Sequence, residues 1–196
     1  MSILKFKISV GKMIVFSAIM ISCQDNKIDE KTGLDVKSEK NAISEVPVNN
    51  EFTFLETTPE RKFPLTDSTN FDNFFSDKFL NQRQLDLIQS KKITDESENL
   101  VVNYRLNLSK NFKTFVFTYN KGEMELFTTL VNYDNDYKFI SKLDIAYDET
   151  AESWFRTESE ISNKEIIVNK ISYTEEAEQS TKTSYKIQKN GMIIKN

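Results

Sequence analysis

The chain of 196 residues has no histidine, one cysteine, four glycines and three prolines. Without histidine it cannot build a Ser-His-Asp or Cys-His catalytic arrangement, the common zinc sites or the His-Glu helix of metalloproteases. Four scattered glycines do not make a phosphate-binding loop, which argues against the familiar kinds of nucleotide chemistry. A single cysteine allows no internal disulfide. We therefore expect no cofactor.

One stretch of the sequence partly matches a calcium-binding EF-hand loop. Asn132, Asp134 and Asp136 match the first three ligand positions of an EF-hand loop. Tyr137 stands where that loop needs glycine, and Leu143 stands where it needs glutamate. We therefore predict a polar hairpin turn at this point and no metal site.

The N-terminal residues have the layout of a secretory signal. Residues 1–12 contain three lysines and no acidic residue, and residues 13–22 are apolar apart from two serines. This apolar run is about half of the roughly 20 residues that a membrane-spanning helix needs. We expect residues 1–22 to be a signal peptide and the mature chain to lie outside the cytoplasm.

The cysteine directly follows this segment, in the order Met20-Ile21-Ser22-Cys23. The motif resembles the lipobox of bacterial lipoproteins, in which aliphatic and small residues precede the cysteine. The resemblance implies cleavage before Cys23 and acyl chains on that residue as a membrane anchor. Gln24 stands where an aspartate would signal retention at the inner membrane. The implied location is therefore the outer membrane of the cell envelope, with the periplasmic and surface faces both open.

Charge and composition divide the mature chain. Removing residues 1–22 takes away three lysines and no acid, which changes the formal net charge from −4 to −7. This balance argues against nucleic acid, whose binding needs clustered lysine and arginine. Residues 24–51 have no aromatic side chain and carry charges of both signs, so we predict a flexible tether over 23–51. A single domain is expected over 52–196.

The first part of the domain has helical spacing. Over about 69–89, apolar side chains recur on one face of a predicted amphipathic helix: Phe71, Phe74, Phe75, Phe79 and Leu85. Either one helix or two short helices broken near Asn81 would fit this pattern. The phenylalanines are expected to pack in the core.

From about residue 100 to the C-terminus the apolar period changes to two, which is typical of strands. Eight such segments follow one another, with connections too short for crossover helices. Asn190-Gly191 is a strong hairpin signal. We predict a mainly β (α+β) fold, an antiparallel meander of about eight strands with the N-terminal helix packed on it. In general style this part resembles small lipoproteins of Bacteroidota, a resemblance that implies no activity.

Acidic residues are densest around the only tryptophan, Trp154: Asp144, Asp148, Glu149, Glu152, Glu158 and Glu160. Two carboxylates flanking a sugar could act as a glycosidase pair, but here they alternate with aromatic residues as on the solvated side of a strand. We assign no catalytic residue.

The aromatic residues of this region give the candidate ligand surface, which consists of Trp154, Tyr133, Tyr137 and Tyr147. The sequence favours a non-enzymatic envelope lipoprotein that binds a protein or a glycan. A carboxylate-dependent envelope hydrolase acting on glycan is the alternative.

Overall fold

The computed structural model describes residues 51–95, 98–150, 155–173 and 177–196. The predicted signal peptide, Cys23 and nearly all of the predicted tether lie outside these residues, and so does Trp154. Among the described helices, none is long and apolar enough to cross a bilayer.

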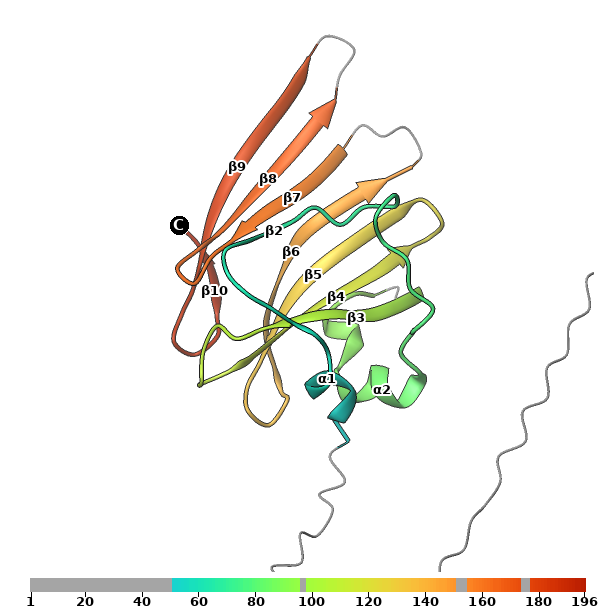
Figure 1. The fold of residues 1–196 in the computed structure, drawn as a ribbon, viewed down its shortest axis with the longest axis vertical. Coiled ribbons are helices and arrows are strands. Elements are labelled where there is room, and N and C mark those ends of the chain that lie inside the picture. The colour runs from blue at the N-terminus through green and yellow to red at the C-terminus, as the bar shows by residue number, and fades with distance from the viewer. Residues whose placement is uncertain (1–50, 96–97, 151–154, 174–176) are drawn as a thin grey trace, which may run out of the picture. The chain divides into compact units, whose positions relative to one another are not determined.

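The described part of the chain is mainly β, as predicted, and its strands form one ten-stranded sheet (Figure 1). The strands are β1 (Glu60–Arg61), β2 (Leu65–Asp67), β3 (Glu98–Leu106), β4 (Lys113–Lys121), β5 (Glu125–Tyr133), β6 (Phe139–Glu149), β7 (Phe155–Ile161), β8 (Ile166–Tyr173), β9 (Glu178–Ile187) and β10 (Ile193–Lys195).

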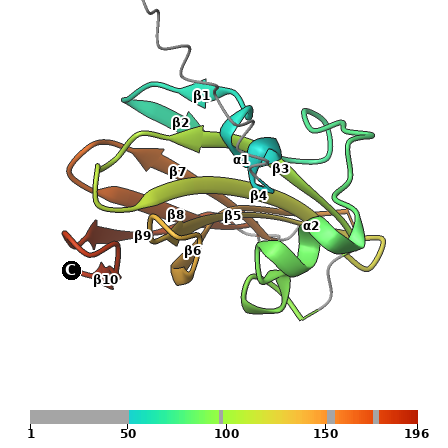
Figure 2. The same cartoon turned by 90° about the horizontal axis from the view of Figure 1, so that it is seen from below.

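The eight segments predicted as strands are β3 to β10, and each pairs antiparallel with the next, so the predicted meander is confirmed. The strand count of about eight was too low because β1 and β2 are only two and three residues long, too short to show a period. β1 pairs parallel with β3, and β2 pairs antiparallel with β7. The β1–β2 segment therefore links two strands that lie far apart in the sheet order (Figures 1 and 2).

The sheet curls, and its C-terminal hairpin, β9–β10, contacts the central strands β5 and β6. The backbone oxygen of Gly191, in the β9–β10 turn, accepts hydrogen bonds from Asn132 Nδ2 of β5 at 2.8 Å and from Ser141 Oγ of β6 at 2.7 Å. The predicted hairpin at Asn190-Gly191 is confirmed, with Gly191 at a φ of 86° that favours glycine.

Two hydrophobic cores lie against this sheet. Cluster 1 contains large side chains from β4 and β5, including Phe117 and Tyr133, and Ile88, which directly follows the helix Gln82–Leu87. Cluster 2 takes side chains from β3 to β8, and residues of β9 and β10 pack against it. Since Gly191 ties the end of the sheet to β5 and β6, the curled sheet encloses cluster 2.

The predicted long helix over 69–89 is wrong. The structure has short helices, α1 (Thr53–Glu56), α2 (Gln82–Leu87) and the 3₁₀ helix η1 (Ser90–Lys92). The break near Asn81 is real, because Asn81 caps α2 in a capping box with Gln84.

Residues 69–80 begin a helical turn that is not continued. Asn70 Oδ1 accepts from the N–H groups of Asp72 and Asn73, as at a helix N-cap, and the N–H of Phe74 donates to the backbone oxygen of Asn70 at 3.0 Å. The segment then runs on without helix, and the N–H of Leu80 donates to the backbone oxygen of Leu100 in β3 at 2.9 Å. The phenylalanine stripe predicted for the core is therefore lost, and Phe75 is 87% exposed.

Candidate functional site

A groove of about 400 Å³ is lined by side chains from β5 to β9. We call it the β6–β9 groove, and it is lined by Phe127, Leu143, Asp144, Tyr147, Phe155, Arg156, Thr157, Val168, Lys170, Ile171 and Tyr185. This volume falls within the range of about 300–1,000 Å³ that is usual for small-molecule sites.

The pairing of β6 is irregular beside the groove. Ile145 has no partner on β5, which makes a β-bulge between the pairs Thr128↔Ala146 and Thr129↔Asp144. Beyond the bulge, β6 pairs with β7 at only two positions, Tyr147↔Thr157 and Asp148↔Arg156. A bulge bends its strand and increases the local twist. Leu143 and Asp144 line the groove before the bulge and Tyr147 lines it after the bulge.

Aromatic rings form one wall of the groove. Phe127 stacks on Tyr119 with ring centroids 5.5 Å apart and meets Tyr147 edge-on at 4.9 Å. Phe155 lies at the rim and is 56% exposed. An exposed aromatic face at the mouth of a groove can contact a ligand without any rearrangement.

Polar groups stand among these rings. Asp144 Oδ1 accepts a 2.6 Å hydrogen bond from Thr129 Oγ1, while the side chain remains exposed. The exposed side chain of Lys170 makes no hydrogen bond or ion pair with any described residue. The Nε of Arg156 also has no partner among the described residues, but this atom is buried. The groove therefore offers a ligand one donor, Lys170, and one acceptor, Asp144, beside its apolar wall.

The structure separates the tyrosines that the sequence grouped as a ligand surface. Tyr147 lines the groove, as a surface role requires. Tyr133 has no exposed surface and donates its hydroxyl to the backbone oxygen of Ile88 at 2.8 Å. Burial raises the pKa of Tyr133 above its ordinary value of 10.0. Tyr133 is thus a core residue that a ligand cannot touch in this structure.

Tyr137 is also a packing residue, 8% exposed and stacked on Phe52. Its hydroxyl donates to Glu56 Oε1, which also accepts from Lys113 Nζ at 2.6 Å. Burial raises the pKa of Glu56, but these hydrogen bonds and the charges of Lys113 and Arg105 outweigh burial and hold the pKa below its ordinary value. This network fixes α1 to β4 and to the β5–β6 turn.

The β5–β6 turn is the predicted polar hairpin. Asp134 Oδ1 accepts from the backbone N–H groups of Asp136 and Lys138.

The carboxylates near the groove are already engaged by protein donors. Asp148 Oδ2 accepts from the N–H of Phe71 at 3.0 Å. Glu149 accepts from the Tyr147 hydroxyl at 2.7 Å and from the N–H of Phe155 at 3.1 Å. The same hydroxyl lies 2.9 Å from Glu125, so two carboxylates converge on Tyr147. Burial and these two negative groups raise the pKa of Tyr147 above its ordinary value.

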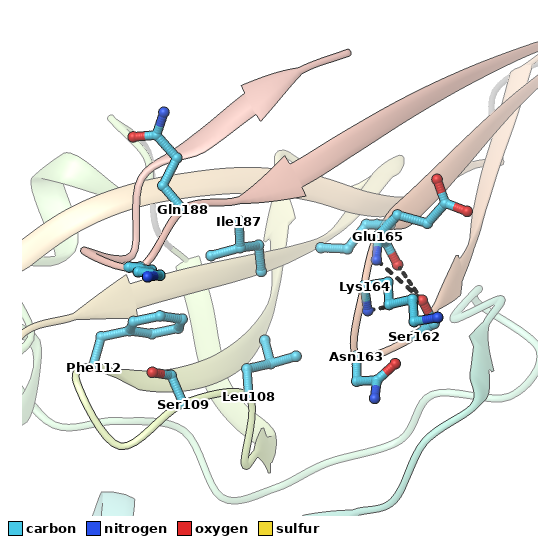
Figure 3. Close-up of a pocket in the computed structure, with 11 residues that line it drawn as sticks. Leu108, Ser109, Phe112, Ser162, Asn163, Lys164, Glu165, Ile187 and Gln188 are labelled. Atoms are coloured by element: carbon cyan, nitrogen blue, oxygen red, sulfur yellow. Dashed lines mark hydrogen bonds between the residues drawn. The ribbon is translucent and has the colours of Figure 1, made fainter.

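A second, smaller pocket of about 190 Å³ lies between three connections of the sheet (Figure 3). Leu108 and Phe112 come from the β3–β4 loop, Ile187 ends β9, and Ser162 to Glu165 form the β7–β8 turn. Ser162 Oγ accepts from the N–H groups of Lys164 and Glu165, which makes the turn a compact polar rim. This pocket is below the usual size for a ligand site and opens onto cluster 2.

Sequence reasoning missed Phe155, Lys170 and Tyr185 as groove residues. Period two placed them on strands, but the registers of β7, β8 and β9, which bring them together, cannot be read from the sequence. Among the described residues, no group of three or more acidic or cysteine side chains could hold a metal ion.

Comparisons with protein families, with curated proteins and with solved structures find no match to this chain.

Proposed function

We propose that this protein is a lipid-anchored component of a bacterial cell envelope whose domain binds a glycan, without cleaving it, in the β6–β9 groove. Cys23 carries the lipid and residues 23–51 form the tether. The proposed location is the outer membrane. The observation that carries the binding function is the groove itself, with its exposed Phe155 beside Lys170 and Asp144.

The lining of the groove suits sugar rings. The aromatic faces of Phe127, Tyr147 and Phe155 can cover the C–H faces of a sugar, since an aromatic ring is negative above its face. Lys170 can donate to hydroxyl or acidic oxygens, and Asp144 can accept from hydroxyls. The groove has the size of a small ligand, whereas a stable protein partner usually covers about 800 Å² of each surface. A short glycan segment therefore fits better than a protein.

The alternative is a glycan hydrolase, and the convergence of Glu125 and Glu149 on Tyr147 is the observation in its favour. Retaining glycosidases hold two carboxyl groups about 5–5.5 Å apart. Against this role, Glu149 is occupied by two protein donors that tie the end of β6 to the start of β7. Turnover of envelope glycan fragments that is lost in Glu149→Gln would establish the hydrolase.

Calorimetric titration of the mature chain, made soluble by Cys23→Ala, with envelope glycan fragments tests the binding function. Phe155→Ala should weaken binding about tenfold, which corresponds to about 1.4 kcal/mol. Phe75→Ala is the matched control, since Phe75 is even more exposed and does not line the groove. Equal affinities of the two variants and the parent would remove the groove from the binding site.

A further inference from the structure

The outer edge of β9 is a long row of backbone groups without a strand partner. β8 pairs with β9 over eight consecutive positions with no bulge, from Ile166↔Tyr185 to Tyr173↔Glu178. On the other side, β10 covers only the last three residues, Tyr185 to Ile187. No described strand pairs with the outer edge from Glu178 to Thr183. Such a regular edge is a template for another strand.

Hydrogen bonds between β9 and the C-terminal residues show which backbone groups of β9 point away from β8. The N–H of Asn196 donates to the backbone oxygen of Ser184 at 3.0 Å, and the N–H of Gln188 donates to that of Met192 at 2.8 Å. The groups of residues 184 and 188 therefore point away from β8. Since successive residues alternate in an antiparallel pair, those of Glu178, Ser180 and Lys182 point outward as well.

The charges of these outward residues match those of a second copy of β9 that runs antiparallel to the first. If a second β9 lies antiparallel with Ser180 opposite Ser180, Glu178 of each copy lies opposite Lys182 of the other. All of these positions have outward backbone groups, as hydrogen-bonded pairs require. Both charged side chains are exposed, and Lys182 makes only a 3.9 Å contact with Glu160, which is exposed as well. Opposite charges directly across a strand pair stabilise it.

We propose that two copies of this chain associate through their β9 edges, with Ser180 at the twofold axis and Glu178 paired with Lys182 on either side. The two sheets then become one continuous sheet. Closed twofold pairing uses up both edges and stops there, so it does not lead to fibres. Each dimer would carry two grooves and two of the proposed anchors.

Sedimentation equilibrium of the Cys23→Ala mature chain over a concentration series tests this pairing. The parent should dimerise. Glu178→Lys and Lys182→Glu should each weaken dimerisation about tenfold, because each homodimer then has two like-charge pairs. An equimolar mixture of these two variants should dimerise again, because the charges at both pairs are then opposite. A parent that stays monomeric at all concentrations would overturn the proposal.

Two further variants separate edge pairing from other causes. Ser180→Pro removes an outward N–H at the proposed axis without touching the bonds to β8, and should abolish the dimer while leaving the melting temperature nearly unchanged. Lys186→Glu makes the same charge change on the same strand where β10 already covers it, and should leave the dimer intact. A dimer that survives Ser180→Pro, or a mixture of the charge variants that does not recover, would show that the contact lies elsewhere.

Discussion

At the scale of single residues, the carboxylate of Asp67 is buried and needs hydrogen-bond donors from the protein. It is 1% exposed and accepts hydrogen bonds from the Tyr104 hydroxyl at 2.5 Å and from the N–H and hydroxyl of Thr69. A buried carboxylate depends on such donors, because leaving it without them costs much more than each bond contributes. The bond from Tyr104 attaches β2 to β3, and the two bonds from Thr69 fix the turn that follows β2.

Tyr104→Phe should therefore destabilise the domain by about 1–3 kcal/mol, the usual cost of leaving a buried polar group without a partner. Denaturant unfolding of the two chains measures the difference. Tyr173→Phe provides the control, since Tyr173 is 38% exposed. A Tyr104→Phe variant as stable as the parent would mean that Asp67 does not rely on this hydroxyl.

The residue scale also shows where sequence reasoning ends. Tyr133 and Tyr147 look alike in an alternating strand pattern, yet one is in the core and the other lines the groove. The last six residues of β5 are all buried, because helical segments and the curled sheet cover both of its faces. Alternation in the sequence cannot reveal that both faces of a strand are covered.

At the scale of elements, strand-forming residues between short turns were sufficient to locate β3 to β9, and the turn at Asn190-Gly191 placed the three-residue β10. The sequence pattern failed for β1 and β2, which form through pairing with distant strands, and for residues 69–80, where the turn that begins at Asn70 is not continued into a helix. The groove could not be predicted because its lining comes from five strands, and the sequence does not reveal their registers or the bulge at Ile145.

The β9–β10 turn gives a prediction at this scale. A Cβ at Gly191 would lie 2.9 Å from Ile140 Cδ1 and 3.2 Å from Phe112 Cγ, whereas a Cβ at Gly122 would meet nothing within 4 Å. Both glycines have positive φ, so each alanine substitution costs about 1 kcal/mol of backbone strain. Gly191→Ala should cost about 1–3 kcal/mol more than Gly122→Ala because of overpacking. Thermal unfolding of the two variants tests this order, and equal losses would contradict it.

At the scale of the whole molecule, five of the seven tyrosines have pKa values raised above 10.0, with burial as the first cause in each case: Tyr104, Tyr119, Tyr133, Tyr137 and Tyr147. A raised pKa means that the folded state binds these protons more tightly than the unfolded chain does. The stability they contribute is therefore present below pH 10 and is lost as the pH rises above it.

The free energy of unfolding should accordingly fall steeply above about pH 10. Tyrosinate absorbance of these five residues should appear together with the loss of circular dichroism of the sheet. Their ionisation near the ordinary pH, with the dichroism unchanged, would contradict the packing described here.

The central claim is that the β6–β9 groove is the binding site of a lipid-anchored envelope protein. Amide chemical-shift mapping during titration of the ¹⁵N-labelled Cys23→Ala mature chain with envelope glycan fragments tests it most directly. Saturable shifts concentrated on Tyr147, Phe155 and Lys170, and absent from the small pocket at Ser162 to Glu165, are the predicted result. Shifts confined to other surfaces, or none with any glycan fragment, would contradict the claim.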